Sequence, residues 1–159
     1  MARLENGTTF PTLRVSRVGG GTIELPDELG GNFGVVLVNR GAWCPYCTAQ
    51  LTAFNRAWDR FQAAGIGVVS FSVDDEAAAA GLVDKHHLKF PVGYGADAAE
   101  VAETLGAYVN DEPHFLQATG FVLAPESTVA VAVYSSGAIG RLVPEDVLGM
   151  VEYAKSQHS

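Results

Sequence analysis

The 159-residue chain has few basic side chains, only two cysteines and no long apolar segment. Ten lysines and arginines stand against eighteen acidic residues, which gives a formal charge of −8 at pH 7. Such a charge disfavours binding to nucleic acids and to anionic lipid, because both carry negative charge themselves. No apolar run approaches the roughly 18 residues that a membrane-spanning helix needs. We therefore expect neither a nucleic-acid partner nor a membrane.

The length and hydropathy of the chain indicate one folding unit. With 48% hydrophobic residues, residues 1–159 are enough for a single domain with one sizeable core. Met1 to Pro11 carries charged and polar residues where a signal peptide would need an apolar stretch. We therefore expect a cytoplasmic protein, and in that reducing compartment a disulfide is more often transient and catalytic than structural.

The two cysteines lie together in the sequence Trp43-Cys44-Pro45-Tyr46-Cys47. An apolar run, Gly34 to Val38, precedes them and a helix-like stretch, Thr48 to Ala64, follows, so we expect the pair at a strand-to-helix turn. Backbone N–H groups and the helix dipole favour a thiolate there. Pro45 suits the first helical position, where a missing N–H costs little. We expect Cys44 to be exposed and outermost.

Cys44 and Cys47 are separated by two residues, so one sulfur can reach a mixed disulfide or sulfenic acid formed on the other. Three other interpretations are a zinc site completed by His86 and His87, a structural disulfide, and two inert thiols. Adjacent histidines rarely both reach one metal, and structural zinc sites usually have paired ligands at zinc-finger spacing. We therefore favour redox chemistry with no metal and no cofactor, and we expect His86, His87 and His158 to be solvated.

Periodicity and turn residues predict the order of the helices and strands. Continuous apolar runs are typical of strands buried on both faces of a parallel sheet, and apolar residues at spacings of three and four indicate helices. The expected elements are a hairpin (Leu13 to Val18 and Thr22 to Leu25), a loop (Pro26 to Asn32), two buried strands (Val35 to Asn39 and Ile66 to Val73), four helices (Thr48 to Ala64, Asp75 to about His86, Ala98 to Tyr108 and Pro144 to Lys155), an extended link (Lys89 to Gly95), an irregular loop (Asn110 to Ala118) and a second hairpin (Gly120 to Leu123 and Val129 to Tyr134).

This order, with the cysteine pair after the first central strand, resembles a thioredoxin-fold protein. The chain is more closely similar to the peroxiredoxin-like members of the alkyl hydroperoxide reductase and thiol-specific antioxidant group. The residues that carry this similarity are 40–51, 120–125 and 134–141. The resemblance implies an α/β thioredoxin-like fold, with a central mixed sheet flanked by helices, an N-terminal hairpin and one added helix.

The chain departs from both families at the site. Thioredoxins attack with the first cysteine of the motif, which implies Cys44, and usually carry a cis-proline where this chain has Gln117 to Gly120. Peroxiredoxins place a proline and a threonine before the peroxidatic cysteine. With Cys47 as that cysteine, Cys44 stands at the threonine position and Arg40 at the proline position. No second arginine is expected beside Thr119, so peroxide would lack donors to polarise its O–O bond.

Two enzymatic mechanisms and one non-enzymatic role follow. In a dithiol–disulfide oxidoreductase, Cys44 attacks the disulfide of a protein or small molecule and Cys47 displaces the partner. In a peroxiredoxin-like thiol peroxidase, Cys47 attacks a hydroperoxide and Cys44 resolves the sulfenic acid. Either enzyme needs an external thiol reductant. The disulfide reaction is slightly favoured because it suits an exposed first cysteine, and a redox-sensing domain is the third alternative.

Several other residues have a proposed supporting role at the site. Arg40 could stabilise the thiolate by its charge or pair with an acidic residue at the surface. Trp43 could shield the sulfurs, contact a partner or serve only in packing. Thr119 could donate to substrate or simply begin a strand. His114 could act as a general base, although nothing in the sequence places it near Cys44. Asp74, which precedes the helix expected from Asp75, is interpreted as its N-cap. The sequence leaves the oligomeric state open.

Overall fold

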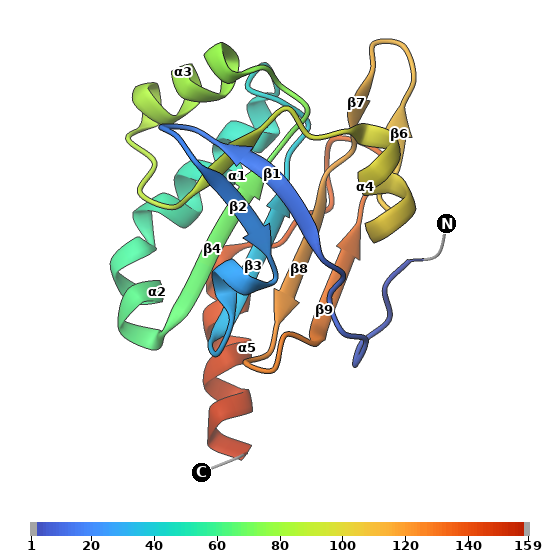
Figure 1. Cartoon of the computed structure of the whole chain (residues 1–159). Coiled ribbons are helices and arrows are strands. Elements are labelled where there is room, and N and C mark those ends of the chain that lie inside the picture. Colours follow the sequence, from blue (N-terminus) through green and yellow to red (C-terminus); the bar gives the residue numbers. More distant parts are fainter. Residues whose placement is uncertain (1–2, 158–159) are drawn as a thin grey trace.

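The computed structural model describes residues 3–157, and a seven-stranded mixed sheet with strand order β2-β1-β5-β4-β3-β8-β9 forms its centre (Figure 1). β3 pairs in parallel with β4 and antiparallel with β8, so it lies in the interior of the sheet. A separate ribbon contains β6 and β7. The strands are β1 (Leu13–Arg17), β2 (Thr22–Leu25), β3 (Phe33–Val38), β4 (Ile66–Phe71), β5 (Val92–Tyr94), β6 (Val109–Asn110), β7 (Phe115–Leu116), β8 (Thr119–Leu123) and β9 (Val129–Tyr134).

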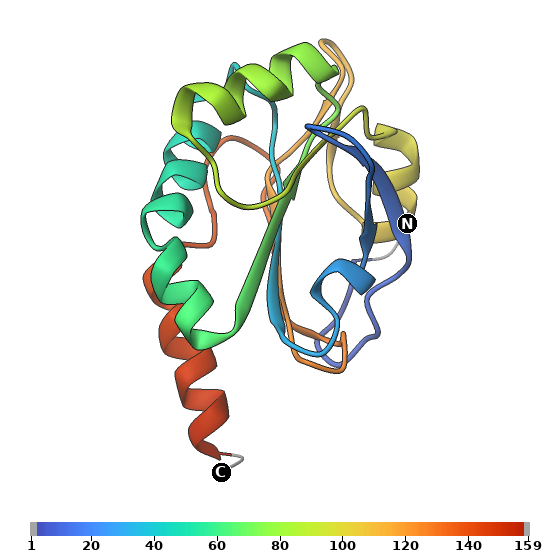
Figure 2. The same cartoon turned by 60° about the vertical axis from the view of Figure 1, so that its left-hand side comes forward.

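Helices cover both faces of the sheet, as expected for an α/β fold. In the view along the sheet, α1, α2, α3 and α5 lie on one side, while α4 and the β1–β2 hairpin lie on the other (Figure 2). The helices are η1 (Asp27–Leu29, a 3₁₀ turn), α1 (Pro45–Arg56), α2 (Trp58–Ala64), α3 (Glu76–His86), α4 (Ala98–Leu105) and α5 (Pro144–Gln157). No helix within residues 3–157 has both the length and the apolar character to cross a membrane.

Alternate residues of the central strands belong to two hydrophobic cores, one on each face of the sheet. In β3, Val36 and Val38 point into the core beneath α4, and Val35 and Leu37 into the core beneath α1 and α5. This double burial explains why the apolar run in the sequence is continuous. The central mixed sheet, the flanking helices and the N-terminal hairpin agree with the predicted fold class.

The local predictions missed several short strands and misplaced one helix end. The extended link expected over Lys89 to Gly95 contains β5, which fills the gap between β1 and β4. The irregular loop expected over Asn110 to Ala118 contains part of the β6–β7 ribbon. The helix expected to reach Tyr108 ends at Leu105, because Gly106 adopts the left-handed conformation that ends helices.

The helix after the cysteines begins earlier than Thr48. It starts at Pro45, with Cys44 as its N-cap, and the chain is interrupted at Ala57 before continuing as α2. Gly65 ends α2 in the left-handed conformation, as its position in the sequence predicted. The early start of α1 matters for function because it places both sulfurs within the first turn of the helix.

Candidate redox site

Cys44 sits where β3 gives way to α1, at the carboxyl end of the central strand. Its Sγ accepts a hydrogen bond from the backbone N–H of Cys47 at 3.4 Å, and Pro45 occupies the first helical position. The sulfur therefore takes the place that a serine or aspartate side chain often takes at a helix N-cap. This arrangement directs backbone N–H dipoles at the sulfur and favours its anionic form.

Cys47 lies one turn further along α1 and is held from the other side. The backbone N–H of Arg40 donates to its Sγ at 3.1 Å. Both cysteines are free thiols, and both are 0% exposed. The expected exposure of Cys44 is therefore wrong, since other side chains cover the sulfurs, and a reagent can reach them only when a covering side chain moves.

Two guanidinium groups lie against the sulfurs, one of which the sequence interpretation missed. Arg40 Nη1 is 3.6 Å from Cys44 Sγ, as a thiolate-stabilising role would require. Arg141 Nη2 is 3.2 Å from Cys47 Sγ and 3.8 Å from Cys44 Sγ. The expectation that no second arginine would lie near Thr119 is wrong, because Arg141 and Thr119 line one small pocket. The separation of 94 residues between Cys47 and Arg141 concealed this contact.

The surroundings separate the two thiols in acidity. Burial opposes ionisation of Cys44, but hydrogen bonds from Cys47 and Arg40, together with the charge of Arg141, bring the pKa of its thiol below the ordinary value. Burial raises the pKa of Cys47, and its hydrogen bond to Cys44 adds to the rise, against the opposing effects of Arg40 and Arg141. The surroundings therefore favour ionisation of Cys44 over ionisation of Cys47.

Trp43 forms part of the aromatic wall beside the sulfurs. Its ring packs edge-on against Phe115, with ring centroids 4.9 Å apart, and is 55% exposed to solvent. The guanidinium of Arg40 lies 5.0 Å from the centroids of both rings, within the range of cation–π attraction. Trp43 thus contacts a residue that contacts Cys44, and its shielding role stays a prediction.

Asp74 does not cap α3. Asp75 does so, because its carboxylate accepts from the backbone N–H of Ala78 at 2.9 Å. The carboxylate of Asp74 instead accepts from the backbone N–H of Ala42 at 2.7 Å, two residues before Cys44. The pattern Asp74-Asp75 could not tell which carboxylate turns towards the helix and which towards the loop.

The remaining predicted residues lie apart from the sulfurs or are already paired. The hydroxyl of Thr119 donates to the carbonyl of Gln117 at 3.2 Å, so it is occupied within its own segment. His114 is exposed in the turn between β6 and β7. His87 is exposed and His86 half-buried at the end of α3, and their carbonyls accept from Asn55. His158 lies outside the described residues.

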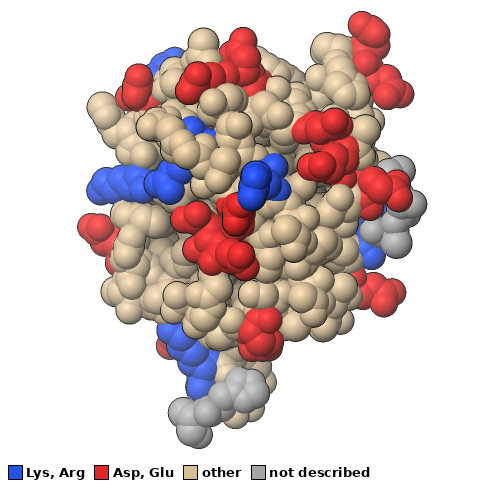
Figure 3. All heavy atoms as spheres, in the orientation of Figure 1, with Lys and Arg blue, Asp and Glu red and all other residues tan. Residues whose placement is uncertain are grey.

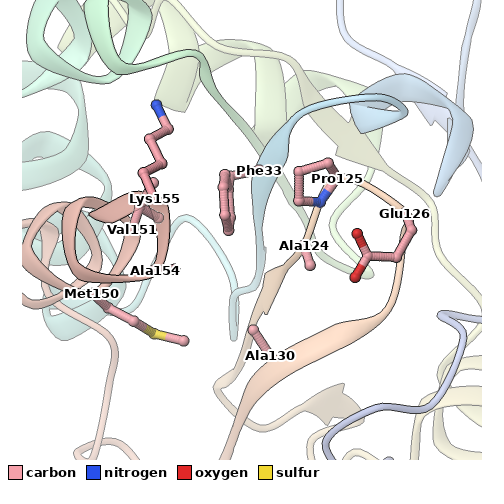
Figure 4. Close-up of a pocket in the computed structure, with 9 residues that line it drawn as sticks. All are labelled: Phe33, Ala124, Pro125, Glu126, Ala130, Met150, Val151, Ala154 and Lys155. Atoms are coloured by element: carbon pink, nitrogen blue, oxygen red, sulfur yellow. The ribbon is translucent and has the colours of Figure 1, made fainter. Parts of the chain in front are cut away.

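No group of three or more histidine, cysteine, aspartate or glutamate side chains within residues 3–157 is arranged to hold a metal ion. A pocket of about 580 Å³ lies far from the thiols, between the start of β3, the β8–β9 turn and α5 (Figure 4). Phe33, Met150 and Val151 contribute to its apolar wall, and Lys155 and Glu126 extend from opposite sides. No cysteine is among the residues that line it.

Charge at the thiols has the opposite sign from charge on the protein as a whole. The chain carries a formal charge of −8, and the face shown in Figure 3 has more acidic than basic side chains. None of the three ion pairs among residues 3–157 involves Arg40 or Arg141. Within the part of the chain that the structure describes, these two guanidinium groups therefore have no carboxylate partner, and both contact sulfur.

Known proteins provide an independent comparison. The chain is 28% identical to a peroxiredoxin of Methanothermobacter thermautotrophicus, over 89% of this chain and 69% of that protein. It is 26% identical to a peroxiredoxin of Nanoarchaeum equitans, over 92% of this chain and 67% of the relative. In both cases the match extends over most of the chain.

Solved structures share the fold at lower sequence identity. Mycobacterium tuberculosis AhpC superposes with a TM-score of 0.81 at 20% identity, covering 98% of this chain and 96% of that one. A cysteine-to-serine mutant of peroxiredoxin 6 from Arenicola marina gives a TM-score of 0.82 at 16% identity, covering 98% and 76% of the two chains. The family model of AhpC/TSA matches residues 6–132, which include both cysteines and Arg40. With Cys44 at the N-cap of α1 and Cys47 in its first turn, this chain is a thiol-dependent oxidoreductase and belongs to the AhpC/TSA family.

Proposed function

We propose that the protein is a thiol peroxidase that reduces hydroperoxides with Cys44 as the attacking thiolate and Cys47 as the resolving thiol, the reverse of the roles that the resemblance to peroxiredoxins implied. The observation that carries the proposal is the position of the Cys44 sulfur, which caps α1 and has two guanidinium groups within 4 Å. A thiolate in such a setting is both populated and accompanied by donors for the oxygen atoms of a peroxide.

The proposed reaction has three steps. The Cys44 thiolate attacks the terminal oxygen of ROOH, the O–O bond breaks, and Cys44 becomes a sulfenic acid as RO⁻ leaves and is protonated to ROH. The Cys47 thiol then condenses with the sulfenic acid, which forms the Cys44–Cys47 disulfide and releases water. An external thiol pair reduces this disulfide, becomes oxidised itself, and restores both cysteines.

The two arginines fit the demands of the first step. Negative charge passes from sulfur to the leaving oxygen during attack, so donors beside the sulfur stabilise the transition state more than the neutral substrate. Arg141 contacts both sulfurs and Arg40 contacts Cys44. The lack of a threonine hydroxyl is therefore offset by two guanidinium groups, which removes the reason for ranking disulfide exchange above peroxide reduction.

Disulfide exchange is the second candidate. The lowered pKa of Cys44, the first cysteine of the motif, favours the same sulfur as the nucleophile towards a disulfide. Exposed Trp43 and Tyr46 flank it and offer an apolar surface to a protein substrate. The two candidates share an oxidised state and differ in the molecule that Cys44 attacks.

A turnover assay distinguishes peroxide reduction from disulfide exchange. The reduced protein is supplied with a thioredoxin or glutathione reductase system and NADPH, and either a hydroperoxide or a disulfide is added. Saturable NADPH oxidation with hydroperoxide supports the peroxidase, and oxidation with disulfide alone supports the exchange enzyme. If neither substrate turns over while the pair still oxidises stoichiometrically, the protein is a redox sensor and the proposal is wrong.

Serine variants assign the attacking sulfur. After one equivalent of hydroperoxide, Cys47→Ser should accumulate a sulfenic acid on Cys44, and Cys44→Ser should not react. Mass spectrometry of dimedone-labelled protein reads both results. The reverse pattern, with a sulfenic acid on Cys47 in the Cys44→Ser variant, would assign attack to Cys47 and overturn the assignment of roles.

We further propose that the reaction runs in the cytoplasm. A chain with two cysteines, both held as free thiols, suits a compartment that returns disulfides to thiols. Fractionation of the source cells, followed by trapping of thiols before lysis, would test this.

A further inference from the structure

Each arginine beside the sulfurs is itself held by a glutamine. Arg141 Nη1 donates to Oε1 of Gln50 at 3.0 Å, and Arg40 Nε donates to Oε1 of Gln117 at 3.0 Å. The two contacts come from different elements, since Gln50 lies on α1 and Gln117 just before β8. They span 91 and 77 residues of sequence, so neither follows from local chain geometry.

Both glutamines are themselves held in place by further hydrogen bonds. The side-chain amide of Gln50 donates to the carbonyl of Leu142 at 3.0 Å, so Gln50 holds both the guanidinium and the backbone that follows it. Gln117 is only 7% exposed, and its backbone N–H donates to the carbonyl of Tyr108 at 2.8 Å. The arginine fork therefore meets acceptors whose positions are set by packing and by further hydrogen bonds.

A glutamine holds a guanidinium differently from a carboxylate. Aspartate and glutamate are the usual fork partners of arginine, and they neutralise its charge as they bind. An amide oxygen accepts the same hydrogen bond with no net charge. The guanidinium keeps its orientation and its full positive charge for the next group it meets, which here is sulfur.

We propose that Gln50 and Gln117 are positioning residues that orient Arg141 and Arg40 over the sulfurs through neutral hydrogen bonds, which reserves both positive charges for the Cys44 thiolate and the departing oxygen. The inference rests on the proposed function of Cys44, but the thiolate can be measured without any peroxide. The charged groups that face the pair are Arg40, Arg141 and Asp74, whose carboxylate binds the backbone N–H of Ala42.

Gln50→Glu and Gln117→Glu test the neutrality of these contacts. Glutamate keeps the length of the side chain and the acceptor oxygen, so a purely geometric role predicts no loss. Under our proposal the added negative charge raises the pKa of the Cys44 thiol, and each unit of that rise lowers the thiolate population about tenfold at acidic to neutral pH. Gln62→Glu, on the exposed face of α2, adds the same charge away from the sulfurs and is the matched control.

The readout is the pH dependence of thiolate absorbance and of iodoacetamide alkylation of Cys44, followed by mass spectrometry. We expect the midpoint of both curves to move upward in Gln50→Glu and Gln117→Glu and to stay in place in Gln62→Glu. The difference from wild type should vanish at low pH, where the new glutamate is protonated. Gln50→Met, which removes the acceptor without adding charge, should lower the rate with peroxide by roughly tenfold or more.

Unchanged midpoints in the glutamate variants would overturn the proposal, whatever the peroxidase assay shows. Gln117 is buried, so if Gln117→Glu fails to fold, Gln50→Glu on the half-buried face of α1 decides the matter alone. A protein that lacks peroxidase turnover but shows the shifted midpoints would keep this inference and lose the proposed function.

Discussion

Strand β3 is apolar throughout, but its two ends have different surroundings. At the carboxyl end, Arg40 and the cysteines bring charge, sulfur and fixed hydrogen bonds under cover. At the amino end, Phe33 opens into an apolar pocket with Met150 and Val151. The carboxyl end has reactive side chains and only a very small pocket, whereas the amino end has a large apolar pocket lined by no cysteine. A detectable pocket is therefore a poor guide to the site in this protein.

Charge at the two ends gives the sharpest test of this difference. Arg141 contacts both sulfurs, whereas Lys155 borders the pocket and donates to the carbonyl of Ala64. Arg141→Met should lower kcat/KM for hydroperoxide by about 100-fold or more, the loss typical of a transition-state donor. Lys155→Met should leave it unchanged. Stopped-flow kinetics of both variants measures this, and equal losses would mean that the comparison of the two ends is wrong.

Glycines at the two ends form a matched pair. Gly41, before the cysteines, has φ 147° and an added Cβ would lie 2.3 Å from Trp43 Nε1. Gly65, beside the pocket end of the sheet, has φ 73° and open space around it. Gly65→Ala should lower the unfolding free energy by about 1–2 kcal/mol and leave the activity unchanged.

Gly41→Ala should cost more stability and also slow peroxide reduction by roughly tenfold to 100-fold, because it displaces Trp43 and the loop that carries Cys44. Urea unfolding and initial rates, measured side by side, give both quantities. Full activity in Gly41→Ala would show that the native position of Trp43 is not required for peroxide reduction.

The pH dependence of alkylation should distinguish the two sulfurs. Iodoacetamide should label Cys44 at a pH below that of an ordinary cysteine and Cys47 only above it, because the pKa of Cys44 is lowered and that of Cys47 raised. Peptide mass spectrometry across a pH series reads each site. Labelling of both sites with one midpoint would contradict the separation.

The same shifts predict how pH affects the stability of the reduced protein. Because the folded pKa of Cys44 lies below its unfolded value, the unfolded state holds more protons between the two, so stability rises with pH across that window. The contribution is complete above the unfolded pKa and is lost as pH falls through the folded one. Cys47 acts in the opposite sense, and its contribution is lost as pH rises through its raised pKa. Cys44→Ser should remove the rise, as urea midpoints would show.

The smallest effect is expected from filling the pocket. Ala130 of β9 is half-buried on its wall. Ala130→Val should raise the unfolding free energy by at most about 1 kcal/mol through added apolar burial. Peroxide rates should stay within about twofold of wild type, since the substitution is far from the sulfurs. A large change in rate would link the two ends of the sheet.

The sequence predicted those parts of the molecule that depend on neighbouring residues. The continuous apolar run of β3, the two cysteines and Pro45 together indicated a strand, a turn and a helix N-terminus, and these are present. The short strand β5 was missed because three residues carry too weak a pattern, and its place depends on pairing with β1 and β4. The prediction that Asp74 caps α3 was wrong because the sequence does not distinguish two adjacent carboxylates whose side chains point in different directions.

The sequence could predict only those site residues that lie close to one another in the chain. Cys44, Cys47 and Arg40 lie within eight residues of one another, so the sequence could place them together. Arg141 and Gln117 come from segments that only the β8–β9 hairpin and the loop before α5 carry to the sulfurs. The similarity noted over residues 134–141 contained Arg141, but a sequence without a fold does not tell which way that arginine points.

The position of Trp43 gives the protein a built-in optical reporter. The chain has two tryptophans, and Trp58 lies away from the thiols, against Phe90. Trp43 touches the guanidinium that contacts Cys44, so making or breaking a bond at that sulfur changes the electrostatic field around the indole. Intrinsic fluorescence therefore offers a label-free record of each oxidation and reduction in real time, with Trp58→Phe isolating the signal.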